Sequence, residues 1–246
     1  MIQFEDVMKS FGEKQVLQGL DLTIEKRETL VIIGQSGCGK SVLLKHVMGL
    51  LKPEGGRVIV DGVDITRVSQ KELYEIRRKF GMVFQSSALF DSLTVGENVI
   101  IGLRERGGYS EMEMERICDE KLEWVGLSGT SHLKPSELSG GMKKRAAIAR
   151  ALAMDPAYIL YDEPTTGLDP INADRINDLI LDLQKRLHKT TIAVTHDMQS
   201  AYKIADRIAM LHEGRMVFMG TPEEVRKSDL PVLQQFINGK AEGPIS

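Results

Sequence analysis

Short apolar runs alternate along the chain with stretches whose apolar residues recur at helical spacing. This alternation predicts an α/β fold with a largely parallel sheet. Residues 16–24 alternate between apolar and polar positions, which predicts an antiparallel strand at a sheet edge. Two runs that flank His212-Glu213-Gly214 predict a hairpin. The other runs of strand length cover 30–33, 58–60, 81–84, 157–161 and 191–194.

Helical patterns dominate the middle of the chain. Apolar residues recur at mostly helical spacing over 111–125, and an alanine-rich pattern covers 139–154. A helical insertion within an α/β domain is the simplest interpretation. We therefore expect a single domain over residues 1–246, with a core at about 1–85 and 155–220, a helical subdomain at about 86–154 and a C-terminal tail at about 221–246.

The tail carries a helix start followed by an apolar cluster. Thr221 precedes Pro222, and proline suits the first turn of a helix. Apolar residues then recur at roughly helical spacing from Leu230 to Ile237. The cluster has two interpretations: it packs on its own domain, or it docks onto a second copy of the chain.

Composition and charge narrow the possible partners. The net charge of −3 gives no broad basic surface, so we expect no binding of nucleic acid or anionic lipid. The two cysteines, Cys38 and Cys118, predict no disulfide framework and suit a reducing cytosol. The N-terminus does not resemble a signal peptide. No apolar run approaches the roughly 18–20 residues that span a bilayer, so we expect membrane contact only through partners.

The stretch from Gly34 to Ser41 reads Gly-Gln-Ser-Gly-Cys-Gly-Lys-Ser, which fits the phosphate-binding P-loop pattern. A predicted strand precedes it and a predicted helix follows, as that motif requires. The glycines let successive backbone N–H groups face one anion at a helix N-terminus. Lys40 can reach the outer phosphates, and Ser41 can hold Mg²⁺.

Two carboxylates end the predicted strand at 157–161. Asp162 at the strand tip can orient Mg²⁺ through water, as in other P-loop enzymes. Glu163 is placed to polarise an attacking water. By itself the pair would more readily be a charge pair at a helix N-terminus, but the P-loop favours the catalytic interpretation.

A second anion-binding helix start precedes the alanine-rich pattern. Ser139 can cap that helix, and Gly140 and Gly141 allow close approach of a ligand to backbone N–H groups. Gln85 follows a predicted strand and can present its amide to Mg²⁺ or water. His196 follows another strand and can contact a γ-phosphate.

Taken in order, these motifs resemble those of the ATP-binding cassette (ABC) ATPases over nearly the whole chain. Leu138-Ser139-Gly140-Gly141 resembles the family's signature motif, and Gln85 resembles its Q-loop. Gly167-Leu168-Asp169 resembles the D-loop, and His196 the switch histidine. The resemblance implies an α/β P-loop NTPase fold of the ABC ATPase type, with a RecA-like core, a mostly parallel sheet, an N-terminal antiparallel β region and an inserted α-helical subdomain.

The same resemblance implies an ATPase that binds ATP and Mg²⁺. Catalysis would depend on Lys40, Glu163 and His196, and the metal would lie against Ser41, Gln85 and Asp162. ATP would contact Phe11 and Val16 on the adenine side, the loop residues Gly34, Gln35, Ser36, Gly37, Cys38, Gly39, Lys40, Ser41 and Val42, and the signature residues Ser139, Gly140 and Gly141.

The resemblance also implies a head-to-tail dimer of two identical chains. Each ATP would be held between residues 34–41 of one copy and 139–141 of the other. Neither copy would then complete a site alone. Closure of the dimer would move the helical insertion, and Gln85 would transmit the motion to a membrane partner.

Three positions depart from the family pattern. Met142 stands where a polar residue such as Gln is usual, and Phe11 replaces the commoner Tyr. Stacking on adenine needs only a ring. Tyr161 is bulkier than the usual aliphatic residue, and its hydroxyl should need a partner if it is buried. None of these departures removes a group that does chemistry, so we expect the site to hydrolyse ATP.

Two segments narrow the resemblance to one branch of the family. Residues 87–99 and 139–151 resemble the ATPases of the Mce-associated systems, which include the bacterial maintenance-of-lipid-asymmetry transporter. That branch implies phospholipid trafficking between the inner and outer membranes of a Gram-negative envelope, from the cytoplasmic side of the inner membrane. Expected partners are an integral membrane permease, an Mce-domain protein and a STAS-type cytoplasmic protein. The alternative is an importer of a small solute, such as an amino acid or an anion.

Other classes of function fit the sequence less well. Soluble ABC proteins of translation or DNA repair usually carry two cassettes or a long coiled-coil insertion, whereas this chain has one cassette and no long heptad run. The presence of Glu163 and His196 argues against a scaffold that binds ATP without turnover. The basic run 143–145 could mark a nucleic-acid patch, but it is short, and we expect a solvated helix face.

Overall fold

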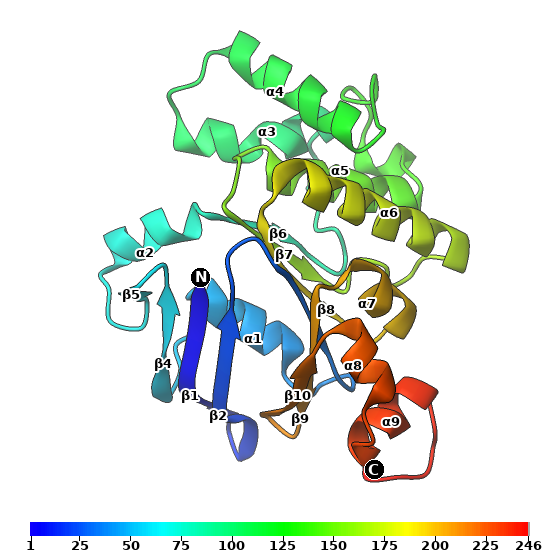
Figure 1. The fold of residues 1–246 in the computed structure, drawn as a ribbon. Helices are drawn as coiled ribbons and strands as arrows, with labels where there is room; N and C mark the ends of the chain where they lie inside the picture. Colours follow the sequence, from blue (N-terminus) through cyan, green and yellow to red (C-terminus); the bar gives the residue numbers. More distant parts are fainter. Residues whose placement is uncertain (246) are drawn as a thin grey trace. The chain divides into compact units, whose positions relative to one another are not determined.

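The computed structural model describes residues 1–245 (Figure 1). The chain divides into two compact units. The first unit combines residues 1–77 with the C-terminal part of the chain from Thr190, and the second comprises Arg78–Lys189. The subdomain expected at 86–154 lies within the second unit, and its exact boundaries stay a prediction.

An antiparallel sheet occupies the N-terminal part of the first unit. Its strands are β1 (Ile2–Phe11), β2 (Lys14–Ile24), β4 (Gly55–Val60) and β5 (Val63–Asp64), in the order β2-β1-β4-β5. The antiparallel strand predicted at 16–24 is thereby confirmed as part of β2. The hydrophobic pattern does not predict β1, because a register shift between Phe4 and Val7 breaks its period-2 alternation.

The second sheet of the first unit has the order β10-β9-β3-β8. Strand β3 (Thr29–Ile33) pairs in parallel with β8 (Thr190–Thr195) and with β9 (Arg207–His212). All residues of β3 and β8 are buried, as is typical of a parallel sheet covered on both faces. Strand β10 (Arg215–Gly220) closes the predicted hairpin. The helices of this unit are α1 (Lys40–Val47), α2 (Gln70–Arg77), α7 (Met198–Ile204), α8 (Pro222–Lys227) and α9 (Pro231–Asn238).

The end of the described chain folds back onto α9. Val232 and Leu233 are buried in the isolated chain, which supports the interpretation that the tail packs on its own domain. The Gln235 side chain donates to the carbonyl oxygen of Ile245 at 3.0 Å and accepts from its N–H at 2.6 Å. Leu230, Phe236 and Ile237 keep part of their surface exposed.

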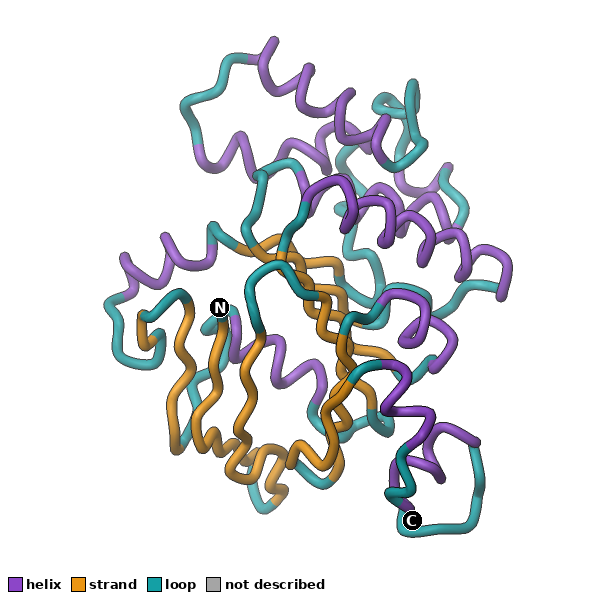
Figure 2. Tube along the Cα trace, viewed as in Figure 1, coloured by secondary structure: helices purple, strands orange, loops and turns teal. Residues whose placement is uncertain are grey.

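The second unit is mainly helical (Figure 2). Its two strands, β6 (Phe80–Val83) and β7 (Tyr158–Asp162), are parallel neighbours, with Val83 opposite Tyr161. Side-chain caps fix the starts of its long helices. Its helices are α3 (Val95–Arg106), α4 (Glu111–Trp124), the 3₁₀ helix η1 (Pro135–Glu137), α5 (Gly140–Leu152) and α6 (Pro170–Leu187).

The Trp124 ring ties α4 to α6. Lys121 Nζ lies 3.4 Å from the ring centroid and Arg186 Cζ lies 4.2 Å from it. Cations at this range are attracted by the ring quadrupole. The Arg186 contact therefore links the end of α4 to the last turn of α6, whereas the Lys121 contact lies within α4.

Candidate functional site

The phosphate loop connects β3 to α1, as the sequence predicts. Its glycines Gly34, Gly37 and Gly39 have φ of 153°, 79° and 111°, which residues other than glycine rarely adopt. A Cβ on Gly34 would lie 2.3 Å from the carbonyl oxygen of Leu211. The loop path thus requires glycine at this position both for backbone conformation and for space.

Lys40 folds its side chain across the loop. Its Nζ donates to the carbonyl oxygens of Gly34 at 2.7 Å and Gln35 at 2.9 Å, and the residue is only 7% exposed. Gln35, Ser36 and Gly37 are exposed. The ammonium group therefore lies inside the curve of the loop, where an anion cradled by the exposed backbone would meet it.

Two residues expected on the adenine side lie in the same unit. Phe11 ends β1 and is 48% exposed; Lys9 Nζ lies over its ring, 5.3 Å from the centroid, which leaves the opposite face for stacking. Val16 in β2 is buried, and its Cγ1 lies 3.0 Å from where a Cβ of Gly39 would stand. Val16 therefore packs directly against the phosphate loop.

His196 lies at the same sheet edge as the phosphate loop. Ile33 of β3 is opposite Thr195 of β8 in the parallel ladder, and Gly34 and His196 are the next residues of their strands. Neighbouring strands are about 4.8 Å apart. The structure therefore brings the exposed His196 beside the start of the loop, where ligands of parallel sheets commonly bind.

In the second unit, Asp162 and Glu163 end β7, and Gln85 follows β6. Both carboxylates are buried, at 9% and 8% exposed, whereas Gln85 is exposed. The Thr166 hydroxyl donates to Glu163 Oε2 at 3.1 Å. The backbone of Glu163 is in the left-handed region, with φ of 51°, which is strained for a residue with a side chain.

Ser139 caps α5 as predicted, so the helix itself begins at Gly140. Its hydroxyl accepts from the Met142 N–H at 3.3 Å. A Cβ on Gly140 would come no closer than 3.4 Å to Leu168, and one on Gly141 no closer than 3.7 Å to Asn172. These are ordinary contacts, and neither glycine has a positive φ. Nothing within the described unit requires glycine at these two positions.

The sequence model of the ABC transporter family matches residues 17–166. The chain belongs to the ABC transporter family. It is 45% identical to the probable ribonucleotide transport ATP-binding protein mkl of Mycobacterium tuberculosis, over 99% of this chain and 68% of mkl. It is 42% identical to the intermembrane phospholipid transport system ATP-binding protein MlaF of Haemophilus influenzae, over 100% of this chain and 93% of MlaF.

Solved ABC cassettes share the fold. A dimeric cassette, MJ0796, in a post-hydrolysis state bound to ADP and Pi has a TM-score of 0.82 and 36% identity, over 90% of this chain and 99% of that one. The methionine import ATP-binding protein MetN of Geobacillus kaustophilus is 43% identical, over 96% of this chain and 70% of MetN. The predicted fold class is confirmed, and the chain is an ATP-binding, ATP-hydrolysing subunit of an ABC transport complex.

The basic run beside the signature motif differs from the expectation of a solvated helix face. Lys144 is buried, at 5% exposed, so that interpretation was wrong for this residue. Burial lowers the pKa of Lys144, and the nearby charges of Glu163 and Asp162 oppose that shift. Arg145 donates to the carbonyl oxygen of Gly126 at 2.9 Å. The run therefore serves contacts within the ABC subunit.

Arg150 contacts the segment that follows Gln85. Its guanidinium donates to the carbonyl oxygens of Ser87 at 2.9 Å and Ala88 at 2.5 Å. Both residues have positive φ, at 64° and 47°. The sequence pattern does not predict this contact, because Arg150 and the segment at Ser87 and Ala88 are far apart along the chain and only the fold brings them together.

The donors expected for Mg²⁺ fit that ion chemically. A hydroxyl, an amide oxygen and a carboxylate, from Ser41, Gln85 and Asp162, are the hard oxygen ligands that Mg²⁺ takes. Ser41 belongs to the first unit, and Gln85 and Asp162 belong to the second. Across residues 1–245, no group of three or more His, Cys, Asp or Glu side chains could hold a metal by itself.

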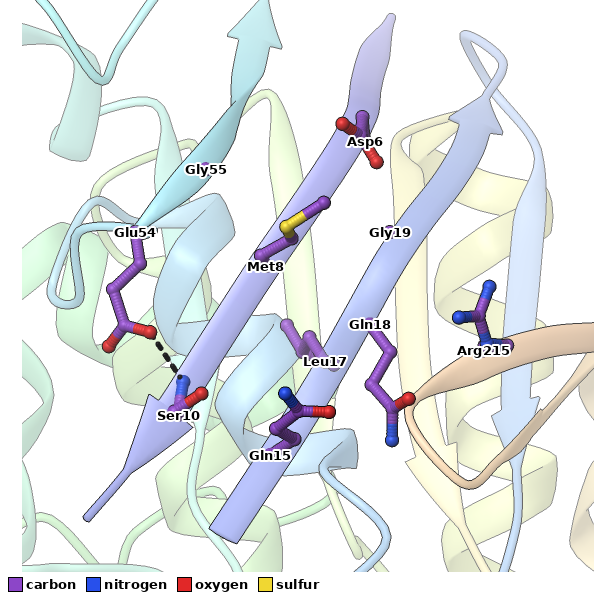
Figure 3. A pocket seen from close by; sticks show the side chains of 10 residues that line it. All are labelled: Asp6, Met8, Ser10, Gln15, Leu17, Gln18, Gly19, Glu54, Gly55 and Arg215. Carbon is purple, nitrogen blue, oxygen red and sulfur yellow. Dashed lines mark hydrogen bonds between the residues drawn. The ribbon is translucent and has the colours of Figure 1, made fainter. Parts of the chain in front are cut away.

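A cavity of about 520 Å³ lies on the antiparallel sheet of the first unit (Figure 3). It is lined by β1, β2 and β4 together with Arg215 of β10. Glu54 at its rim accepts from the Ser10 N–H at 3.0 Å and from Lys9 Nζ at 2.8 Å. None of the residues predicted to bind nucleotide lines this cavity, so it is separate from the phosphate loop.

Proposed function

We propose that this ABC ATPase drives phospholipid transport between the inner and outer membranes of a Gram-negative envelope. The observation that carries the proposal is the 42% identity to MlaF, a phospholipid transport ATPase, over the whole of this chain. The segments 87–99 and 139–151, which follow Gln85 and the signature motif, resemble the same branch. The chain departs from the family pattern at Phe11, Met142 and Tyr161. None of these departures removes a side chain that we propose to bind Mg²⁺ or to act in hydrolysis.

The proposed catalytic unit is a head-to-tail dimer with two ATP molecules at its interface. Residues 34–41 of one copy would hold the phosphates, and Ser139, Gly140 and Gly141 of the other would complete the site. Gly140 and Gly141 support this arrangement, because no contact within their own unit requires glycine there. The dimeric MJ0796 cassette, at 36% identity, supports it as well.

Within that site, each side chain has a distinct role. Lys40 would neutralise the outer phosphates, and Glu163 would orient the attacking water and accept its proton. His196 would contact the γ-phosphate from its position beside Gly34. Bound Mg²⁺, held by Ser41, Gln85 and Asp162, would supply charge neutralisation at the phosphates.

We further propose a permease in the membrane, an Mce-domain protein and a STAS-type protein as partners. Within residues 1–245 the structure has no helix that is both long and apolar enough to cross a bilayer. The proposal therefore places the ABC subunit peripherally, on the cytoplasmic side of the inner membrane, and assigns the lipid pathway to the partners.

Purification of the intact complex tests this function. The tagged chain should co-purify with an integral membrane permease and phospholipid, and the complex in proteoliposomes should move labelled phospholipid only with ATP. A complex that carries Glu163→Gln serves as the matched control and should assemble without transport. Lipid transfer at the same rate with and without ATP would contradict the proposal.

Import of a small solute is the second candidate function. The observation in its favour is the 43% identity to MetN, which is named for methionine import. In the same purification, a solute-binding protein and ATP-dependent uptake of an amino acid would favour this alternative over phospholipid transport.

A further inference from the structure

The buried lysine of the signature helix contacts two segments of the proposed active site. Lys144 Nζ donates to the carbonyl oxygen of Gln85 at 2.5 Å and to that of Glu163 at 3.3 Å. Gln85 is a proposed metal ligand, and Glu163 is the proposed base. All three residues belong to the second unit.

The two carbonyl groups lie at equivalent positions on neighbouring strands. In the parallel ladder of β6 and β7, Val83 is opposite Tyr161, and no further pair follows. Gln85 and Glu163 each lie two residues beyond that last pair. The Lys144 ammonium therefore bridges the two chains just where the sheet hydrogen bonds that held them together have ended.

The backbone beyond this point is strained in both segments. Glu163 has φ of 51°, and Ser87 and Ala88 have φ of 64° and 47°. Left-handed conformations are strained for residues with a side chain and need to be held by their surroundings. Lys144 supplies such a contact to Glu163, and Arg150, from the same helix, supplies contacts to Ser87 and Ala88.

Burying the charged ammonium group of Lys144 between two loops costs desolvation free energy. Desolvation of a charge is compensated only when the group is fully hydrogen-bonded, and an apolar residue of similar size is often as stable. Lys144 is 5% exposed, so the cost applies here. The contacts that offset it go to the backbone of the two proposed catalytic segments, which points to a role in the reaction rather than in stability alone.

We propose that Lys144 is a positioning residue that couples the signature helix to Gln85 and Glu163. A shift of α5, when Ser139 engages a nucleotide, would be carried by the Lys144 side chain to both segments at once. The inference rests on the proposed roles of Glu163 and Gln85 in ATP hydrolysis. Through Lys144, the N-terminal end of α5 would influence the proposed base, Glu163, and the proposed metal ligand, Gln85, of the same chain.

Replacement of Lys144 tests the link. Lys144→Met keeps the length of the side chain but removes the charge and the donors, so kcat for ATP should fall at least tenfold while KM stays within about twofold. Lys144→Arg retains charge and donors and should recover a substantial part of kcat. Compared with the unmodified chain, Lys144→Met should show faster hydrogen–deuterium exchange in the peptides that cover residues 84–90 and 162–168. Both peptides should change together.

Lys143→Met is the matched control, because it removes the same charge one residue earlier on the same helix. It should leave kcat and exchange close to those of the unmodified chain. A Lys144→Met variant with kcat within twofold of the unmodified chain would overturn the proposal. The proposal would also be overturned if kcat fell equally in Lys144→Met and Lys144→Arg while hydrogen–deuterium exchange at both peptides stayed unchanged.

Glu163→Gln, measured alongside, separates the two hypotheses. If Glu163→Gln retains turnover, the proposed role of Glu163 fails, whatever the Lys144 variants do. If Glu163→Gln loses turnover and Lys144→Met does not, the catalytic role of Glu163 stands and only the coupling through Lys144 fails. Melting temperatures of all variants identify any that fail to fold.

Discussion

Glu163 is the residue on which the proposed chemistry depends most. It is buried at the end of β7, its backbone is left-handed, and Thr166 donates to its carboxylate at 3.1 Å. Each of these features fixes the direction of the side chain. A general base acts only when it is held within hydrogen-bond reach of the water that it activates.

We predict that Glu163→Gln leaves ATP binding intact and reduces turnover at least tenfold. Glutamine preserves the shape of the side chain but does not accept a proton, and a positioned base contributes about 10²–10⁴ in rate. Phosphate release measures turnover, and a fluorescent ATP analogue measures binding. Hydrolysis close to that of the unmodified chain would remove Glu163 from this role.

The phosphate loop gives a second prediction at the residue scale. Gly39→Ala places a Cβ 3.0 Å from Val16 Cγ1 and 3.2 Å from the Val16 carbonyl oxygen, at φ of 111°. We expect ATP affinity to fall at least tenfold, because the loop must shift. Gly37→Ala is the comparison for conformation alone, since a Cβ there meets nothing within 4 Å. Equal loss in both variants would assign the effect to backbone conformation rather than to packing.

At the scale of elements, the caps of several helices depend on ionised glutamates. The Thr94, Ser110 and Thr221 caps each pair with a glutamate three residues later, and their N–H and hydroxyl donors lower the pKa of Glu97, Glu113 and Glu224 below the usual 4.5. A lowered pKa in the folded chain stabilises the fold above the unfolded value and loses that contribution as pH falls through the folded value.

We therefore predict that these caps stabilise the fold by a constant amount above about pH 5, and that the melting temperature falls as pH drops below about 4. Because Glu113 and Glu224 are exposed and Glu97 is half-buried, salt should reduce the effect. A triple variant, Glu97→Gln, Glu113→Gln and Glu224→Gln, should show a shallower decline with pH. An identical decline in the triple variant would contradict this assignment.

The sequence predicts those parts of the fold and of the site that leave a pattern in the residue types. The strands β3, β7 and β8 are fully buried apolar runs, and the P-loop requires glycine for steric reasons, so both are evident from residue types. Strand β1 was missed because its bulge breaks the alternation. The burial of Lys144 was also missed, because only the tertiary fold brings Gln85 and Glu163 to the same side of α5.

At the scale of the whole molecule, we propose that one chain is not a complete enzyme. Gly140 and Gly141 lie at a helix start that requires no glycine for its own packing. We predict that Gly141→Ala folds at least as stably as the unmodified chain, because alanine favours helix over glycine. The same variant should lose ATP-dependent dimerisation, as measured by size-exclusion chromatography. A variant that still dimerises with ATP would contradict the proposed role of Gly141.

The most direct test of the account joins two differently marked chains. One population carries Ser36→Cys and the other Ser139→Cys, both in a background of Cys38→Ala, Cys118→Ala and Glu163→Gln, so that a short thiol crosslinker can join only the two marked sites. The account predicts a covalent dimer in the mixture with ATP, and none with ADP or in either population alone. With ATP binding intact, a complete absence of the dimer would contradict the claim that two copies enclose the nucleotide.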